Sequence, residues 1–333
     1  MLSVTHLWFD AVVERPIVLN THKGSAIRGA FFHALRGRLG NERRWPGFCA
    51  NQAAAECRGC ALLPGCPVAY LLATHDPTGQ RGHEIPRPVA VKPPVTEKTV
   101  YLLGEAFRFG LTIMGDAVNL LPYVILATQE GMPIEGLGKR DKVNEFKRGA
   151  FRLRAVYGHH PLHGQTEVLW QEGQRLVQVP DLPVTHEEVC IYAAQLPTNR
   201  LTLRLQTPMR LIHRGKLVRS FRFRPFFQRL MERLSLLSST VGEGNFFANR
   251  EERVALLDLA DQVAVIDNTR WVELRSYSTR RKRESPTSGL VGEVTLVGDL
   301  TELRSWLVWG AQLHVGKDAV KGDGWYEVGD FRF

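Results

Sequence analysis

Long apolar runs and low-complexity tracts are absent from this sequence. None of its apolar stretches approaches the roughly 20 residues that a membrane-spanning helix needs. Apolar residues still make up 44% of the 333 residues, which excludes a largely disordered chain and allows two domains with cores of their own. No basic leader precedes the first apolar residues, and Asp10 comes early, so we expect no signal peptide and a cytoplasmic protein without a membrane partner.

Acidic residues are scarce in the basic segments of the second half of the chain. The formal charge is +9, from 43 basic and 34 acidic residues. Between Arg200 and Arg233 stand ten Lys or Arg residues and a single acid, Glu232. A second basic cluster comprises Arg275, Arg280, Arg281, Lys282 and Arg283. One such cluster is as often a solvated face, but two favour a nucleic-acid partner, because each neutralised phosphate releases counterions.

Cysteine is nearly confined to one short segment. Four of the five cysteines follow the pattern Cys49-x7-Cys57-x2-Cys60-x5-Cys66, inside an insertion at about residues 45–75. Because disulfides are not expected in a reducing cytoplasm, we predict that four thiolates hold a structural Zn²⁺ ion. An iron–sulfur cluster, indicated only by the Cys66-Pro67 pair, and free thiols remain the alternatives. The fifth cysteine, Cys190, is expected to be a small buried residue.

The chain repeats one strand–helix unit. Residues 111–116 read LTIMGD and residues 294–299 read VTLVGD, and a run of helical period follows each. In both copies the glycine lets the chain turn, and Asp116 or Asp299 can cap the first turn of the helix. A glycine-bearing stretch and another strand come next in both. The shared order indicates a duplicated unit.

Apolar periodicity gives each half of the chain a β-α-β-β-α-β order. In the first half it predicts strands over 5–19, 87–93, 106–114 and 151–157, with helices over 24–40 and 117–131. In the second half it predicts strands over 201–212, 263–278, 289–298 and 324–328, with helices over 223–239 and 300–313. This order predicts an α+β protein with tandem ferredoxin-like (RRM-like) domains. We expect the domains over 1–157 and 196–333, with a hairpin and linker over 158–195.

Three segments carry a resemblance to a known family. They are residues 107–127 (FRFGLTIMGDAVNLLPYVILA), residues 207–237 (from TPMRLIHRGK to RLSLL) and residues 270–328 (from RWVELRSYS to KGDGWYEV). Together they resemble the CRISPR-associated endoribonucleases of the RAMP superfamily, which process precursor crRNA. The early RGAFFHALRGRLG and the four-cysteine insertion are similar to one branch of that family. The resemblance implies tandem ferredoxin-like folds, binding of CRISPR repeat RNA and cleavage without a metal ion.

The most specific part of this resemblance is the loop HVGKDAVKGDGWY. Gly316, Gly322 and Gly324 allow backbone conformations and close approaches that side chains would block. Successive exposed N–H groups in such a loop can hold an anion, and Lys317 and Lys321 add positive charge. The resemblance places RNA contact here, although by itself a loop with three glycines more often only turns the chain. The acids at positions 318 and 323 depart from a purely basic or neutral loop.

A histidine on the first helix is the candidate for catalysis. Cleavage without a metal needs one group to deprotonate the 2′-OH and another to protonate the leaving 5′ oxygen, and histidine titrates near neutral pH. Helical period places Ile27, Phe31, Ala34 and Leu35 on one face and His33 away from it, beside Ala26, Ala30 and Gly37. The resemblance puts a catalytic histidine on or beside this helix, which favours His33, with His22 second. An ordinary surface histidine is the alternative.

Cations near His33 are the expected helpers. Lys23, Arg28 and Arg36 are predicted to hold RNA or to stabilise the charged transition state. The arginine cluster from Arg275 to Arg283 suits phosphate and unpaired bases. The expected reaction leaves a 2′,3′-cyclic phosphate. Two other functions stay open: a non-catalytic crRNA-binding subunit of a CRISPR effector complex, and a zinc-bearing regulator or other nucleic-acid-binding protein.

Overall fold

The structure is a computed structural model. It describes residues 2–37, 45–52, 57, 60–72, 86–244, 246, 250–278 and 283–329. The chain forms two compact units: the N-terminal unit comprises Thr5–His159 and Gln165–Leu182, and the C-terminal unit comprises Met1–Val4, His160–Gly164 and Pro183–Phe333. The division passes through the expected linker, since the strand over 165–171 belongs to the first unit and the helix over 186–195 to the second.

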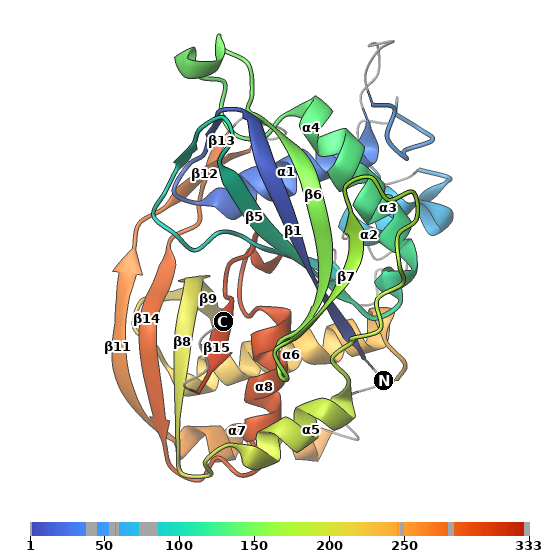
Figure 1. The fold of residues 1–333 in the computed structure, drawn as a ribbon. Coiled ribbons are helices and arrows are strands. Elements are labelled where there is room, and N and C mark those ends of the chain that lie inside the picture. Colours follow the sequence, from blue (N-terminus) through green and yellow to red (C-terminus); the bar gives the residue numbers. More distant parts are fainter. Residues whose placement is uncertain are drawn as a thin grey trace. The chain divides into compact units, whose positions relative to one another are not determined.

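The N-terminal unit contains one five-stranded sheet (Figure 1). Its strands are β1 (Val4–Arg15), β3 (Val89–Lys92), β5 (Ala106–Met114), β6 (Ala150–His160) and β7 (Gln165–Gln171), in the spatial order β3-β5-β1-β6-β7. Two short strands, β2 (Ile17–Val18) and β4 (Val100–Tyr101), pair separately. The first four strands of the large sheet have the order of a split β-α-β fold, and β7 extends it at one edge.

Four short helices accompany this sheet: α1 (Lys23–Arg36), α2 (Pro67–Leu72), α3 (Leu121–Leu126) and α4 (Met132–Glu135). The helix expected over 117–131 is broken up. A 3₁₀ stretch at Gly115–Leu120 precedes α3, and a π-helical turn at Ala127–Gly131 joins α3 to α4. Pro133 explains the irregular turn, because its ring clashes with the carbonyl four residues earlier and its nitrogen donates no hydrogen bond.

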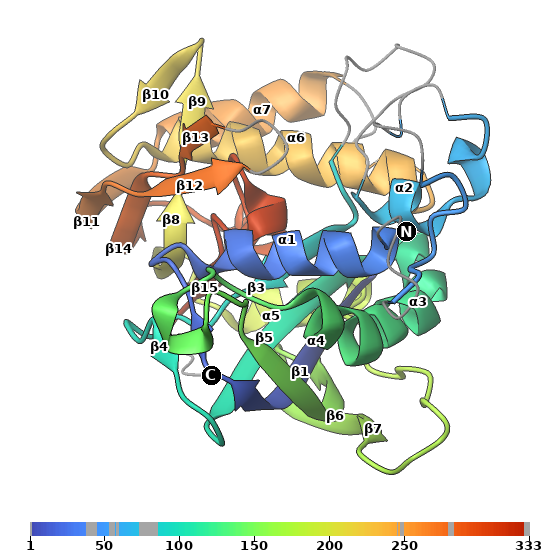
Figure 2. The ribbon, with the colours of Figure 1, turned by 90° about the horizontal axis from the view of Figure 1, so that it is seen from above.

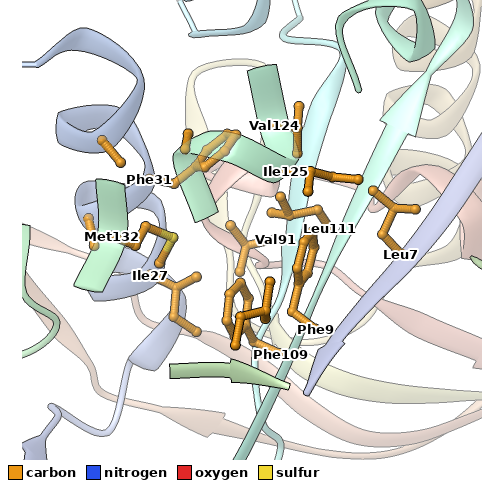
Figure 3. Packing of buried hydrophobic residues seen from close by; sticks show 14 of the residues in the cluster. Leu7, Phe9, Ile27, Phe31, Val91, Phe109, Leu111, Val124, Ile125 and Met132 are labelled. Atoms are coloured by element: carbon orange, nitrogen blue, oxygen red, sulfur yellow. The ribbon is translucent and has the colours of Figure 1, made fainter. Parts of the chain in front are cut away.

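The core of the N-terminal unit lies between its helices and one face of the sheet. Figure 3 shows Ile27 and Phe31 of α1 and Val124 of α3 facing the sheet residues Phe9 and Phe109. The rings of Phe9 and Phe109 stack with centroids 5.2 Å apart. All five side chains are at most 1% exposed. The apolar stripe of α1 is therefore fixed against the sheet, as its period predicted.

The C-terminal unit repeats the same sheet order with different strands. Its main strands are β8 (Arg200–Met209), β11 (Ala264–Val272), β14 (Gly289–Val297) and β15 (Tyr326–Val328), in the order β11-β14-β8-β15. Two hairpins stand beside it: β9 (Leu211–His213) with β10 (Lys216–Val218), and β12 (Arg275–Ser278) with β13 (Arg283–Pro286). The prediction of two ferredoxin-like folds is confirmed.

The helices of this unit are α5 (His186–Gln195), α6 (Phe223–Val241), α7 (Arg250–Asp261) and α8 (Arg304–Leu313). Figure 2 shows α6 and α7 side by side. The sequence did not predict α7. Asp299 was expected to cap α8, but the helix begins at Arg304, after Leu303, and has no side-chain cap. The Asp299 carboxylate instead accepts a hydrogen bond from the Thr301 N–H (3.0 Å) in the turn before the helix. Within the described part of the chain, no helix is both long and apolar enough to cross a membrane.

The fold predicts a large cost for opening the core around Phe109. The Phe109 ring is fully buried and contacts the rings of Phe9, Phe107 and Phe151. We expect Phe109→Ala to lower the free energy of unfolding by about 3–5 kcal/mol, measured by urea denaturation. The control is Leu103→Ala, because Leu103 is 70% exposed and its removal should change stability by less than about 0.5 kcal/mol. Equal effects from the two variants would contradict this placement of the core.

Candidate functional site

Helix α1 positions the candidate catalytic histidine. Ile27, Phe31, Ala34 and Leu35 are buried, as predicted, and hold one face of the helix against the core. The helix ends at Arg36, earlier than predicted, because Gly37 has a φ of 74° and leaves the helical path. The Gly37 N–H still donates to the His33 carbonyl oxygen at 2.8 Å. A side chain at Gly37 would collide with the Pro46 carbonyl, so this helix end requires glycine.

His33 is partly exposed, which its predicted role requires. Its ring contacts the ring of Phe32 edge-on, with centroids 5.5 Å apart. The small-residue surface expected beside it is narrower than predicted, because Ala30 and Gly37 are buried and only Ala26 is half-buried.

His22 occupies a different environment. It is the residue before the first turn of α1 and is only 6% exposed. Its Nδ1 lies 2.7 Å from the Ser25 hydroxyl. Burial and this contact favour a structural role at the start of the helix, so His33 is the better candidate for contact with a substrate.

The three cations near His33 do not share one role. Lys23 is 4% exposed, and its ammonium group donates to the Pro94 carbonyl oxygen (3.1 Å) and to the backbone and hydroxyl oxygens of Thr96. Burial lowers the pKa of Lys23. These contacts tie the start of α1 to the 94–96 loop, which argues against the predicted contact with RNA. The Arg28 guanidinium lies 5.1 Å from the centroid of the Phe32 ring, within cation–π range.

Arg36 faces the cysteine segment. Its Nη2 donates to the Gln52 carbonyl oxygen at 3.3 Å. Its charge also acts on the thiol of Cys57. Burial raises the pKa of that thiol, the neighbouring cysteines Cys66, Cys49 and Cys60 raise it further, and Arg36 opposes the shift. Arg36, the last residue of the helix that carries His33, therefore connects this helix to the cysteine segment.

Three of the four clustered cysteines, Cys49, Cys60 and Cys66, line one pocket. All four are half-buried free thiols. Among the described residues, no three cysteine sulfurs lie within 4.8 Å of one another. A filled tetrahedral zinc shell would need shorter separations, with Zn–S bonds of about 2.3 Å. The fifth cysteine, Cys190, is exposed, so the expectation that it is buried was wrong.

The glycine-rich loop of the C-terminal unit needs its glycines. Gly316, Gly322 and Gly324 have φ values of 108°, 93° and 71°, which side chains rarely adopt. A Cβ at Gly324 would lie 1.9 Å from the Val315 carbonyl oxygen, and one at Gly316 would lie 2.6 Å from that of Arg210. The predicted need for special backbone conformations and close approaches is confirmed at these positions.

Several amides of this loop already have partners. The Lys317 N–H donates to the Arg210 carbonyl oxygen (2.9 Å), and the Gly324 N–H donates to that of Pro208 (3.0 Å). The N–H groups of Lys321 and Gly322 donate within the loop itself. The first two amides anchor the loop to the end of β8 and the other two close turns within the loop, so these four do not form the anion cradle that the sequence predicted.

Side-chain charges leave Lys317 as an exposed cation of the loop. Lys321 forms an ion pair with Asp318 at 2.7 Å. Asp318, one of the two acids in this loop, therefore neutralises the charge of one of the loop's two lysines. Asp323 is 1% exposed and does not face solvent. The predicted RNA contact is thus better supported for Lys317 than for Lys321.

Most of the basic residues over 200–233 have partners within the fold. Arg204 pairs with Glu293, Arg210 donates to the Ser288 carbonyl, Arg219 lies over the Trp271 ring, Arg224 pairs with Asp261, Arg229 pairs with Glu232, and Arg233 donates to the Leu313 carbonyl. Burial lowers the pKa of Arg233 to about 10, so it remains charged at neutral pH. The number of basic residues in this segment is therefore larger than the number of cations without a partner in the fold that could bind a phosphate backbone.

The second basic cluster lies on a hairpin. Arg275 begins β12 and pairs with Glu284 of β13 at 3.2 Å, and both side chains are more than half exposed. An exposed ion pair of this kind contributes about 0–1 kcal/mol, so a phosphate can displace it. Arg283 lies in β13. Arg280, Arg281 and Lys282 lie outside the described residues.

Comparisons with known proteins agree with this fold. Residues 203–326 match the family model of the CRISPR-associated endoribonuclease Cas6, and residues 2–182 match a family model described as an N-terminal domain. A Cas6 product complex is 17% identical with a TM-score of 0.54, and Cas6 of Thermus thermophilus is 16% identical with a TM-score of 0.53. Each comparison covers 98% of this chain and 99% of the other. No curated protein sequence matches significantly.

One further similar structure belongs to a chain longer than this one. The partial Cas6-RT-Cas1–Cas2 complex is 12% identical with a TM-score of 0.57, covering 98% of this chain and 46% of that one. Two ferredoxin-like units, the second with a glycine-rich loop before its last strand, give the chain the fold of these Cas6 structures. Within that fold, residues 203–326 are a domain of the Cas6 family of CRISPR-associated endoribonucleases.

The loop geometry predicts that Gly324 tolerates no side chain. We expect Gly324→Ala to destabilise the C-terminal unit, because the new methyl group would collide with the Val315 carbonyl, and to weaken repeat-RNA binding by displacing Lys317. The control is Gly215→Ala. Gly215 has a similar φ of 76° but nothing within 4 Å of a new Cβ, so it should lose only the conformational cost of about 1–2 kcal/mol. Equal losses of stability in urea would contradict the packing of this loop.

Proposed function

We propose that this chain binds CRISPR repeat RNA and cleaves precursor crRNA by metal-independent general acid–base catalysis centred on His33. The observation that carries the proposal is the placement of His33. In a chain with a domain of the Cas6 family, a half-exposed histidine stands on the first helix, whose opposite face is fixed in the core. The rigid helix limits how far the imidazole can move, which acid–base catalysis requires.

The proposed reaction is an attack of the ribose 2′ oxygen on the adjacent phosphorus. A general base removes the 2′-OH proton, the bond from phosphorus to the 5′ oxygen breaks, and a general acid supplies a proton to that oxygen. The products are a 2′,3′-cyclic phosphate and a 5′-hydroxyl end. His33 takes one of these two roles. Arg28, five residues before His33 on α1, and Arg36, three residues after it, are the candidate side chains to stabilise the charged transition state.

The non-catalytic alternative has the same fold. A crRNA-binding subunit of an effector complex would keep the RNA contacts and lack the cleavage. One similar structure contains a Cas6 in a complex with RT, Cas1 and Cas2, so we include other CRISPR proteins among the proposed partners. Cleavage of repeat RNA by the isolated chain separates the two functions.

The proposal predicts that His33→Ala loses cleavage and keeps binding. We expect the single-turnover rate on repeat RNA to fall by about 10²–10⁴, with the dissociation constant nearly unchanged, because acid–base help acts only on the reaction. The matched control is His213→Ala, which removes another half-exposed histidine and should cut at the normal rate.

Two outcomes would overturn the assignment. Full activity of His33→Ala together with loss in His22→Ala would move the catalytic role to His22. Loss of cleavage in EDTA, with recovery when Mg²⁺ is added back, would exclude the metal-independent reaction. Mapping of the product ends tests the cyclic phosphate directly.

We also propose that Cys49, Cys57, Cys60 and Cys66 hold one structural zinc ion. The donor set fits: Cys49, Cys60 and Cys66 line one pocket, and these three thiols also help to raise the pKa of Cys57. Binding of zinc would convert them to thiolates and draw the sulfurs together. With all four positions filled by protein, the ion would fix the insertion and take no part in cleavage.

The zinc proposal predicts a difference between two cysteine substitutions. Cys57→Ser should release about one equivalent of zinc from the purified protein and lower its thermal stability, because a hydroxyl is a poor replacement for a thiolate ligand. Cys190→Ser is the control, since Cys190 is exposed and stands apart from the pocket. Metal analysis of the two variants is the measurement. Iron with sulfide in place of zinc would favour the cluster, and unchanged metal content would favour free thiols.

A further inference from the structure

Three side chains with metal-binding chemistry meet in the C-terminal unit, apart from the cysteines. His160 is the last residue of β6, His163 lies in the turn that follows, and Glu188 lies in the first turn of α5. Their ligand atoms all lie within 4.8 Å of one another. In the described residues this is the one group of three or more such side chains at that spacing. None of the three takes part in the proposed cleavage.

The two imidazoles point at the same carboxylate oxygen. His160 Nε2 lies 3.1 Å from Glu188 Oε1, and His163 Nε2 lies 3.8 Å from it. The two rings stack with centroids 4.5 Å apart and an angle of 16° between their planes. Ligands on one tetrahedral Zn²⁺ ion stand about 3.4 Å apart when the bonds are about 2.0–2.1 Å. The observed separations from Oε1 fall on either side of that value.

Glu188 is held in place for this role. Its other oxygen, Oε2, accepts hydrogen bonds from the Thr185 N–H (2.8 Å) and the Thr185 hydroxyl (2.7 Å), as part of the capping box of α5. Such contacts fix the direction of Oε1 before any ion binds. An outer hydrogen bond to a ligating carboxylate is a common feature of metal sites.

His160 is buried without an adequate hydrogen-bond partner. Its side chain is 2% exposed, and neither ring nitrogen makes a hydrogen bond of regular geometry within the described structure, although Nε2 lies close to Glu188. Neutral imidazole is the form that binds metals. A buried imidazole whose ring nitrogens make no regular hydrogen bond is suited to an ion.

We infer that His160, His163 and Glu188 bind one divalent transition-metal ion of the Zn²⁺ type. Two imidazoles and a carboxylate are a donor set that suits such ions and leaves a position for water. The ion joins the 160–164 turn to the start of α5, two segments of the C-terminal unit that are separate in sequence. It is a structural link, independent of the metal-independent cleavage proposed above.

The test is metal titration of chelator-treated protein. Zn²⁺ affinity is measured by competition with a chromophoric chelator, in a Cys57→Ser background that disables the cysteine site. His163→Ala and Glu188→Gln should each bind Zn²⁺ at least about tenfold more weakly, since even outer partners of a metal site contribute about 10–100-fold. The matched control is Glu187→Gln, the exposed neighbour of Glu188 on the same helical turn, which should bind normally.

Two further measurements distinguish this site from the cysteines and from misfolding. Co²⁺ bound here should show d–d absorption without a thiolate-to-cobalt charge-transfer band. Circular dichroism should be the same for His163→Ala and its parent, because the His163 side chain is 42% exposed. Unchanged Zn²⁺ affinity in both His163→Ala and Glu188→Gln would overturn the inference. Absence of Zn²⁺ binding in the Cys57→Ser background would overturn it as well, and the three side chains would then form an ordinary His–Glu contact. RNA cleavage is not the readout, so these outcomes are separable from failure of the proposed function.

Discussion

The packing of the apolar face of α1 against the N-terminal sheet is the constraint on which the candidate site depends. Ile27 and Phe31 enter a core that Phe9 and Phe109 of the strands complete. With that face fixed, the rotation of the helix is set, and His33 must lie on its partly exposed side. The helix ends at Arg36, where Gly37 leaves the helical path, and the Phe48 N–H beside the first cysteine donates to the Leu35 carbonyl oxygen. One packed interface therefore positions both the imidazole and the insertion.

Strand β8 has a similar organising role in the C-terminal unit. It pairs with β14 and β15, and the carbonyl groups of Pro208 and Arg210, at and just beyond its end, receive the amides of the glycine-rich loop. The loop is therefore a fixed structure before RNA arrives. Since these amides have partners, the electrostatic contribution of the loop comes from side chains, chiefly the exposed Lys317. Asp318 reduces that contribution by pairing with Lys321.

The two kinds of proposed metal site differ in how well a sequence reveals them. The cysteine pattern is visible because two of its ligands, Cys57 and Cys60, are close neighbours in the chain. The histidine–glutamate group has no such pattern, since Glu188 follows the two histidines only after another strand and a long connection. Its members meet because the chain returns to place α5 beside the turn after β6. Only the geometry of the folded unit indicates that site.

The sequence alone determined the two β-α-β-β-α-β units and the buried face of α1, because both follow from the spacing of residues that avoid water. It also determined the glycines of the loop, because they follow from local backbone preferences. Helix α7 and the partners of the charged side chains were decided by tertiary contacts, whereas the break at Pro133 is a local effect of proline that the apolar period did not predict. Lys23 was expected to meet RNA, yet it is buried against the 94–96 loop. Arg204 found a partner in Glu293, far along the chain. The net charge depends only on how many basic and acidic residues the sequence has. The electrostatic potential at a binding surface depends also on which acidic side chains the fold places beside the basic ones.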